Sequence, residues 1–471
     1  MLFNSITFVY FFIIFFVLYW LLKNHLRGQN ILLLFASYIF YGWWDYRFLS
    51  LIIFSTIIDY FCGLRIANAQ SKSIKRLFFA ISLIINLGLL GAFKYLGFFI
   101  DSFQDLLEVF GIQQARSTLQ IILPVGISFY TFQTMSYSID IFRGRMQPTK
   151  DFISFAAFVS FFPQLVAGPI ERASHLLPQI EKKRGFDYQK SKEGVKIALY
   201  GLFKKVAIAD TAAPFVNDIF ANYEQQGPLI LLLGAILFPF LIYGDFSGYC
   251  DIARGISYLQ GIELMINFKQ PYFSKNIGEF WKRWHISLST WFRDYVYIPL
   301  GGSKFGLKNT LRNIYIIFLV SGFWHGANWT FIIWGGIHAT LYLPVLLAKR
   351  KTNYANTHTK SALNGLKMFL TFLCVTLAWV YFRADNIQIA NDYILRIFSF
   401  GKNSFEVFTK TSIHLLSILK FIVALVFMLF IDGLLSKEKH LSTKLFIFSI
   451  TLGLIFLGSY RNAIDFIYFQ F

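Results

Sequence analysis

Long apolar segments separated by short, mostly basic loops run along the whole chain. A helix that crosses a bilayer needs about 20 predominantly apolar residues, and fewer where neighbouring protein buries its ends. The pattern predicts an all-α polytopic membrane protein with about 11–13 spanning or re-entrant helices. The candidate segments are 6–22, 30–43, 48–64, 77–99, 119–140, 151–168, 194–213, 228–258, 313–327, 329–347, 366–383, 411–434 and 443–460.

Two of these segments are too broken to be ordinary spans. Segment 119–140 contains Pro124 and Gly126, and segment 151–168 leads into Pro169 through a second proline and a glycine. Irregular backbone at membrane depth is tolerated only where protein or a cavity covers it. We therefore expect both segments to form broken or re-entrant helices.

The composition excludes an ordinary soluble domain. Hydrophobic residues make up 56% of the 471 residues and charged residues only 15%, whereas a soluble domain carries about 25% charged residues. The formal net charge of +19 lies largely in short loops such as 182–196 and 349–351. Such loops set topology and contact anionic lipid headgroups. Because no basic stripe accompanies a nucleic-acid-binding motif, we expect membrane lipid and no nucleic acid as a partner.

Loop charge also predicts the orientation. The loops at 65–76, 143–150 and 182–196 are basic, whereas the expected loop at 101–108 carries three acidic residues and no lysine or arginine. Basic loops stay on the cytoplasmic side, so the N-terminus is expected outside the cytoplasm. The two basic loops that flank 151–168 place both ends of that segment on the same side.

The N-terminal segment predicts a retained first span. Residues 1–22 lack a basic n-region and a small-residue cleavage site, which a removable signal peptide needs. No internal repeat, low-complexity tract or soluble insert is visible, so we interpret residues 1–471 as a single transmembrane domain of a multi-pass protein in the cell (inner) membrane.

Residues 266–312 differ from the other connections because basic residues alternate with aromatic ones. This composition is typical of helices that lie in the plane of the membrane interface. We place the stretch on the cytoplasmic side, leading into the core, with His285 near the mouth of any cavity that His325 lines. The residues are Lys269, Lys275, Trp281, Lys282, Arg283, Trp284, Trp291, Phe292, Arg293, Tyr295, Lys304, Lys308 and Arg312.

His325 is the strongest candidate for chemistry. It lies within an apolar segment, where an ionisable side chain is costly and usually faces a protein-lined cavity. A buried, uncharged imidazole can accept a proton, as a general base for a hydroxyl nucleophile must. Small neighbours at Gly322 and Gly326 permit close approach, and Asn328 offers an amide for an oxyanion. The alternative is a histidine that only packs between helices.

Two further histidines lie in the same region. His285 either orients His325 or a substrate group, or is an interfacial histidine on an amphipathic helix. His338 follows His325 by thirteen positions, which on one continuous helix is a separation of about 20 Å. That separation argues against a shared metal site, and the three widely spaced cysteines offer no ligand pair. We expect no bound metal or cofactor.

Several charged residues near these segments also need an interpretation. Asp245 is an intramembrane carboxylate whose role stays open between a proton path, substrate binding and a structural ion pair. Asp251 is expected to pair with Arg254. Arg293 and Asp294 are adjacent, and adjacent residues on a helix do not face each other, so each is expected to pair elsewhere.

Five motifs together resemble the membrane-bound O-acyltransferase (MBOAT) family, in the bacterial polysaccharide branch that includes the alginate O-acetyltransferase membrane subunit and, more distantly, the teichoic acid D-alanyl transferase. The resemblance covers nearly the whole chain and is most specific in its centre. The motifs are WKRWHISLSTWFRDYVYIPLGG at 281–302, SGFWHGANW at 321–329, LPVGISFYTFQ at 123–133, FPQLVAGPIE at 162–171 and YGDFSGY at 243–249.

The resemblance implies a fold and a site. The family fold is a set of helices around a central funnel, with re-entrant segments and interfacial helices. The family's invariant histidine corresponds to His325 and its second signature position to His285, so both are expected to be catalytic. Trp324, Asn328 and Asp245 are further candidates for substrate binding or oxyanion stabilisation.

The resemblance also implies an O-acetyltransferase that moves acetyl groups from a cytoplasmic donor, acetyl-CoA or an acylated carrier, toward an extracytoplasmic polysaccharide. A partner acetyltransferase outside the cytoplasm is expected to complete polymer modification. Two alternatives stay open: transfer of D-alanine or another acyl group to a teichoic-acid-like polymer, and a non-catalytic transporter or scaffold. The polymer, the donor, the direct acceptor and the oligomeric state are left open by the sequence.

Overall fold

The computed structural model describes residues 1–112, 121–351, 362–399, 415–436, 443–460 and 466–467. Among these residues the regular secondary structure is helical, as the hydrophobic pattern predicts. Six helical stretches are long and apolar enough to cross a membrane, and three shorter apolar helices accompany them. The protein is therefore a helical multi-pass membrane protein.

The described chain forms two compact units. Unit 1 comprises residues 1–198 and 250–265, and unit 2 comprises residues 199–249 and 266–471. Two helices, α10 (Tyr188–Phe203) and α12 (Pro228–Leu259), contribute residues to both units. The single-domain interpretation of residues 1–471 stays a prediction.

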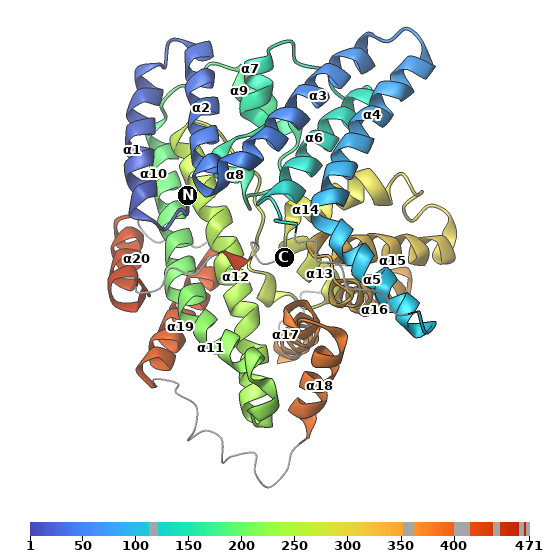
Figure 1. Ribbon diagram of the computed structural model, residues 1–471. Helices are drawn as coiled ribbons and strands as arrows, with labels where there is room; N and C mark the ends of the chain where they lie inside the picture. The colour runs from blue at the N-terminus through green and yellow to red at the C-terminus, as the bar shows by residue number, and fades with distance from the viewer. Residues whose placement is uncertain (113–120, 352–361, 400–414, 437–442, 461–465, 468–471) are drawn as a thin grey trace. The chain divides into compact units, whose positions relative to one another are not determined.

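Among the described residues, unit 1 contains α1 to α9 and parts of α10 and α12. Within it α3, α4 and α6 pack on one another, and α7 packs on α2, α3 and α9 (Figure 1). The bounds are α1 (Ile6–Leu21), α2 (Leu26–Asp45), α3 (Leu49–Asn68), α4 (Lys72–Leu90), α5 (Leu96–Val109), α6 (Ile127–Phe142), α7 (Phe152–Val159), α8 (Phe162–Leu165), α9 (Ala173–Glu181) and α10.

Both segments that were predicted to be broken are broken. The helix of the first begins only at Ile127, directly after Gly126, whose φ of 77° lies in the left-handed region that glycine favours. A Cβ at Gly126 would strike the carbonyl oxygen of Leu165. The second segment divides into α7 and α8 at Ser160 and Phe161. The expectation of a loop at 101–108 is wrong, because these residues form part of α5. Their apolar side chains recur with the period of a helix.

A buried carboxylate joins three helices of unit 1. Asp59 on α3 accepts hydrogen bonds from Asn86 (2.8 and 3.0 Å) and Ser82 (2.5 Å) on α4. Thr134 on α6 donates to the Asn86 side-chain oxygen at 2.9 Å. Because a buried polar group without a partner is costly, these donors explain how a carboxylate is accommodated in the core.

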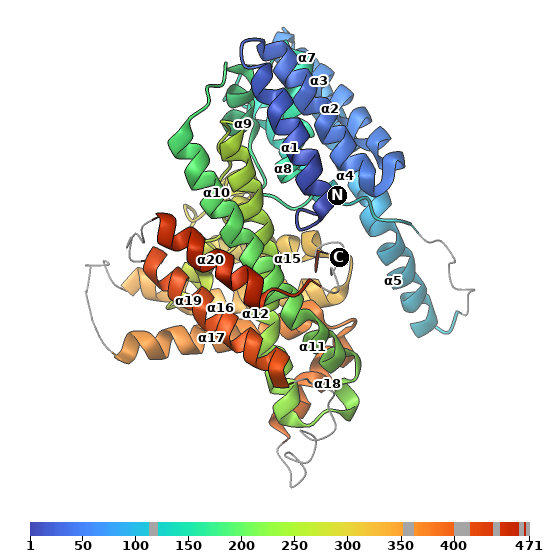
Figure 2. The same ribbon diagram turned by 90° about the vertical axis from the view of Figure 1, so that its left-hand side faces the viewer.

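Unit 2 contains the segments that carry the candidate motifs. Its described helices other than α12 are α11 (Asp210–Ala221), α13 (Ile277–Arg283), α14 (Ile286–Phe292), α15 (Gly306–His325), α16 (Trp329–Lys351), α17 (Ala362–Arg383), α18 (Ile387–Phe398), α19 (Leu415–Ser436) and α20 (Thr443–Leu457). α16 packs on both α15 and α17 (Figures 1 and 2).

Two glycines let α15 and α16 approach closely. A Cβ at Gly322 would strike the carbonyl oxygen of Phe331, and a Cβ at Gly335 would strike that of Phe318. Small residues at membrane helix interfaces permit such backbone contact. The chain reverses between these two helices at residues 326–328, and this turn fixes His325 at the C-terminal end of α15.

Candidate active site

His325 points into the aromatic core of unit 2. His325 is 2% exposed. The centroid of its ring lies 5.2 Å from that of Trp334 and 5.4 Å from that of Phe382. Trp324, its neighbour in sequence, has its ring at 5.0 Å. The imidazole is therefore enclosed by aromatic rings and removed from lipid, as a catalytic base requires.

His285 lies against His325. The two ring centroids are 6.1 Å apart, and His285 is fully buried. Burial lowers the pKa of His285 to about 3, because desolvation penalises the charged form. The ring is thus uncharged at neutral pH. The structure brings together the two histidines that the motifs indicated.

The backbone at His285 is held in an unusual conformation. Its φ of 44° and ψ of 54° lie in the left-handed region, which a residue with a side chain seldom adopts. Two backbone hydrogen bonds with the segment that ends at Lys269 hold this conformation. Ile286 N–H donates to the Asn267 carbonyl oxygen at 3.0 Å, and Lys269 N–H donates to the Arg283 carbonyl oxygen at 2.9 Å. This conformation directs the imidazole inward at the start of α14.

Trp324 contacts both histidines. Its ring lies 5.9 Å from that of His285 as well as 5.0 Å from that of His325, and it is 3% exposed. It therefore forms part of the enclosure that the two imidazoles share.

Asn328 lies in the turn before α16. Its Oδ1 accepts from Thr330 N–H at 3.0 Å, which caps the helix, and its Nδ2 donates to the Asp385 carbonyl oxygen at 2.8 Å. These bonds tie the turn after His325 to the end of α17. Stabilisation of an oxyanion by Asn328 stays a prediction.

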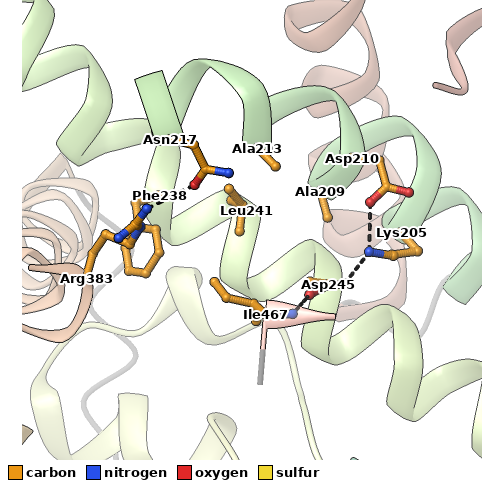
Figure 3. Close-up of a pocket in the computed structure, with 10 residues that line it drawn as sticks. All are labelled: Lys205, Ala209, Asp210, Ala213, Asn217, Phe238, Leu241, Asp245, Arg383 and Ile467. Atoms are coloured by element: carbon orange, nitrogen blue, oxygen red, sulfur yellow. Dashed lines mark hydrogen bonds and ion pairs between the residues drawn. The ribbon is translucent and has the colours of Figure 1, made fainter. Parts of the chain in front are cut away.

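Asp245 forms part of a buried ion cluster (Figure 3). Lys205 lies between two carboxylates, 2.9 Å from Asp245 and 2.7 Å from Asp210. The second oxygen of Asp245 accepts from Ile467 N–H at 2.6 Å. These contacts form a structural ion cluster. The next residue on α12 is Phe246, and the centroid of its ring lies 4.8 Å from that of His285. Substrate binding by Asp245 stays a prediction.

A cavity of about 640 Å³ lies beside α15 within unit 2. Ser321, one helical turn before His325, and Trp281 contribute to its lining, together with the cationic side chains Lys282 and Arg293. The volume lies in the range typical of small-molecule sites. Ile286, next to His285 in the chain, also lines it, but neither His285 nor His325 is among the lining residues. The expectation that His325 lines a cavity with His285 near its mouth is therefore not met by this cavity.

Two expectations about neighbouring residues are wrong. Because the chain reverses after α15, His338 does not lie about 20 Å from His325: the ring of Trp334 contacts both imidazoles, at 5.2 and 4.8 Å. Arg293 and Asp294 pair with each other at 2.7 Å, because the long guanidinium side chain reaches past its neighbour in a π-helical turn. The expected pairing of Asp251 with Arg254 is confirmed at 3.4 Å.

The structure adds Asn267 to the site, which the sequence did not indicate. Its side-chain oxygen lies 3.2 Å from His285 Nδ1, and it is 1% exposed. No motif or spacing in a single sequence connects residues 267 and 285. Only the folded turn brings them together.

Residues 145–383 match the MBOAT, membrane-bound O-acyltransferase family. This range includes both histidines and covers half of the chain. The chain belongs to the membrane-bound O-acyltransferase family. It is an acyltransferase, and its reaction uses an acyl donor as a co-substrate.

Curated relatives extend the similarity beyond this range. The chain is 43% identical over 406 residues to the probable alginate O-acetylase AlgI of Pseudomonas aeruginosa, covering 85% of this chain and 75% of that protein. It is 37% identical over 423 residues to the peptidoglycan O-acetyltransferase of Helicobacter pylori, covering 83% and 78%. It is 31% identical over 317 residues to the teichoic acid D-alanyltransferase of Streptococcus thermophilus, covering 60% and 75%.

Proposed function

We propose that this acyltransferase moves acetyl groups from a cytoplasmic thioester donor across the membrane for O-acetylation of an extracytoplasmic polysaccharide, and that His325 is its general base. The observation that carries the proposal is the pair of buried imidazoles with ring centroids 6.1 Å apart. The cavity of about 640 Å³ is lined by Ile286 and Ser321, which lie one and four positions from these histidines in the chain. The relatives support the acetyl group, since those named for acetyl transfer are more similar to this chain than the one named for D-alanyl transfer.

The chemistry follows from an uncharged imidazole. His325 takes the proton of an acceptor hydroxyl as its oxygen attacks the carbonyl carbon of the thioester. The tetrahedral intermediate then collapses, the carbon–sulfur bond breaks, and the imidazolium returns the proton to the thiolate. The aromatic enclosure excludes water, which would otherwise hydrolyse the donor.

The donor is proposed to occupy the cavity beside α15. An acetyl thioester carried by coenzyme A or by a carrier protein ends in a long arm that carries phosphate. Lys282 and Arg293 would attract that phosphate, while the acetyl end lies toward Ser321. Both donor types share this chemistry, and acetyl transfer from each can be measured separately.

We place the N-terminus outside the cytoplasm and residues 266–312 on the cytoplasmic side, because of the basic loops. An extracytoplasmic acetyltransferase is the proposed partner, accepting the acetyl group directly or assisting its transfer to the polymer. Labelling of single cysteines in whole cells with a membrane-impermeant reagent tests this orientation.

Mass spectrometry of cell-surface polysaccharide tests the function. Cells that carry the native protein are expected to show acetyl esters on the polymer, and cells that carry the His325→Gln variant at equal membrane abundance are expected to show none. D-alanyl esters in place of acetyl esters would support the alternative acyl group. Acetylation that persists in the variant would support a non-catalytic transporter or scaffold.

A further inference from the structure

Asn267 contacts His285 through one side-chain oxygen that serves three partners. Its Oδ1 lies 3.2 Å from the backbone nitrogen of Ser287, 2.9 Å from the Ser287 hydroxyl and 3.2 Å from His285 Nδ1. All three residues are buried. The same asparagine accepts the Ile286 N–H on its backbone carbonyl, so it clamps the strained turn at His285 from two points.

The backbone partner fixes the orientation of the amide. An asparagine side chain has an oxygen that accepts and a nitrogen that donates, and the two are exchanged by a half-turn of the group. Ser287 N–H can only donate, so the atom that faces it must be the oxygen. The same oxygen faces His285.

This orientation determines which ring nitrogen of His285 carries the proton. An uncharged imidazole has one N–H donor and one acceptor nitrogen, and a partner on one nitrogen sets the tautomer. Because the Asn267 oxygen can only accept, Nδ1 must donate to it. Nε2, at the far edge of the ring, then keeps its lone pair.

We infer that Asn267 is a positioning residue for acyl transfer, which holds His285 as the Nδ1–H tautomer and so presents Nε2 to the reaction as a hydrogen-bond acceptor. The inference rests on the proposed function in assigning His285 to the reaction. It gives His285 a defined part in the reaction. Its lone pair receives a hydrogen bond from one ring nitrogen of His325, while the other ring nitrogen of His325 takes the proton of the attacking hydroxyl. The uncharged ring of His285 does not donate to the oxyanion.

The surroundings of His285 agree with an uncharged acceptor. The rings of Phe246, Phe268, Trp324 and His325 pack around it. Of these four neighbours, three are apolar aromatic residues and the titratable one is His325. The hydrogen bond from Nδ1 to the Asn267 side-chain oxygen therefore orients the ring.

The test compares Asn267→Leu and Asn267→Asp by steady-state kinetics of the full-length protein in nanodiscs, with acetyl-CoA as donor and an oligosaccharide acceptor. Leucine removes the acceptor. We expect kcat to fall about 10–100-fold, the range known for partners that orient histidines at metal sites, while KM for the donor changes less than about twofold. Aspartate keeps the acceptor but adds a charge that raises the pKa of His285. We therefore expect a smaller loss of kcat and an acid limb of activity that moves toward neutral pH.

Ser287→Ala is the matched control, because it removes a donor from the same oxygen and leaves the contact with His285. It is expected to keep the native pH profile and a kcat within about twofold. A native kcat in Asn267→Leu, or an unmoved acid limb in Asn267→Asp, would overturn the inference. If Asn267→Leu fails to fold, the pH profile of activity in Asn267→Asp tests the inference by itself.

Parallel measurement of His285→Gln and His325→Gln separates this inference from the proposed function. Loss of activity in both histidine variants with native kinetics in Asn267→Leu refutes only the tautomer role. Native activity in His285→Gln refutes the participation of His285, and with it the inference. Native activity in His325→Gln refutes the proposed base.

Discussion

The imidazole rings of His285 and His325 lie 6.1 Å apart at an interplanar angle of 66°. Because the two rings are neighbours, a substrate hydroxyl that reaches His325 also lies close to His285. The two signature histidines, forty positions apart in the chain, act on one reaction centre in the proposed mechanism.

The ring of Trp324 is expected to be needed for the geometry of both histidines. Trp324→Phe keeps an aromatic ring and should reduce kcat less than about tenfold. Trp324→Ala leaves a cavity, which costs about 3–5 kcal/mol of folding free energy, and should reduce kcat further. Acetyl transfer by purified protein, with melting temperatures measured alongside, checks this order. Equal activity in both variants contradicts the role of the ring.

Close contact between α15 and α16 predicts a difference between two glycines. Gly322→Ala places a methyl group against the Phe331 carbonyl oxygen and should destabilise the protein by about 1–3 kcal/mol. Gly336→Ala is the matched control, since its Cβ meets only a Leu319 methyl group at 3.7 Å. Thermal unfolding in detergent measures both. Similar melting temperatures for the two variants would show that the contact does not matter.

The ion cluster around Lys205 predicts a large effect of removing the cation. Lys205→Met leaves Asp210 and Asp245 facing each other without a counter-charge, and breaking a buried ion pair in this way costs about 3–5 kcal/mol. Lys190→Met removes the exposed pair with Glu263 and should cost less than about 1 kcal/mol. The two melting temperatures give the comparison. A loss in Lys205→Met no larger than that in Lys190→Met argues against a tightly coupled cluster.

The lowered pKa of His285 predicts acid sensitivity. The folded pKa is about 3 and the unfolded value is near 6.5, so between these values the unfolded chain binds a proton that the folded protein does not. Stability attributable to this group is thus unaffected above pH 6.5 and falls by about 1.4 kcal/mol per pH unit below it.

Melting temperatures of the native protein and the His285→Gln variant at pH 7.5, 5.5 and 4.5 measure this effect. The native protein should lose more stability on acidification than the variant. The exposed His25, changed to glutamine, serves as control and should follow the native curve. Parallel curves for the native protein and His285→Gln would mean that His285 is charged in the folded state.

Much of the fold follows from local sequence patterns. Apolar segments of sufficient length gave the helices, and Gly126 and the break at Ser160 interrupt helices where the sequence indicated. The helical residues 101–108 were missed because their acidic side chains resemble those of a loop, although the spacing of apolar residues between them is helical. A charge count does not report this spacing.

The site was predictable only in part. His285 and His325 stand in distinctive motifs, so their participation was expected. The contact of Asn267 with His285 and of Trp334 with both His325 and His338 depends on how turns reverse the chain. Such contacts are set by tertiary packing, which no local pattern in one sequence encodes.

The proposed mechanism depends most directly on the base at position 325. Acetyl transfer from acetyl-CoA by the purified protein in nanodiscs should be compared for the native protein, His325→Gln and the His25→Gln control. Removing a general base is expected to lower kcat by about 10²–10⁴-fold, with an unchanged melting temperature and native activity in the control. A folded His325→Gln variant that transfers acetyl groups at the native rate would contradict the mechanism.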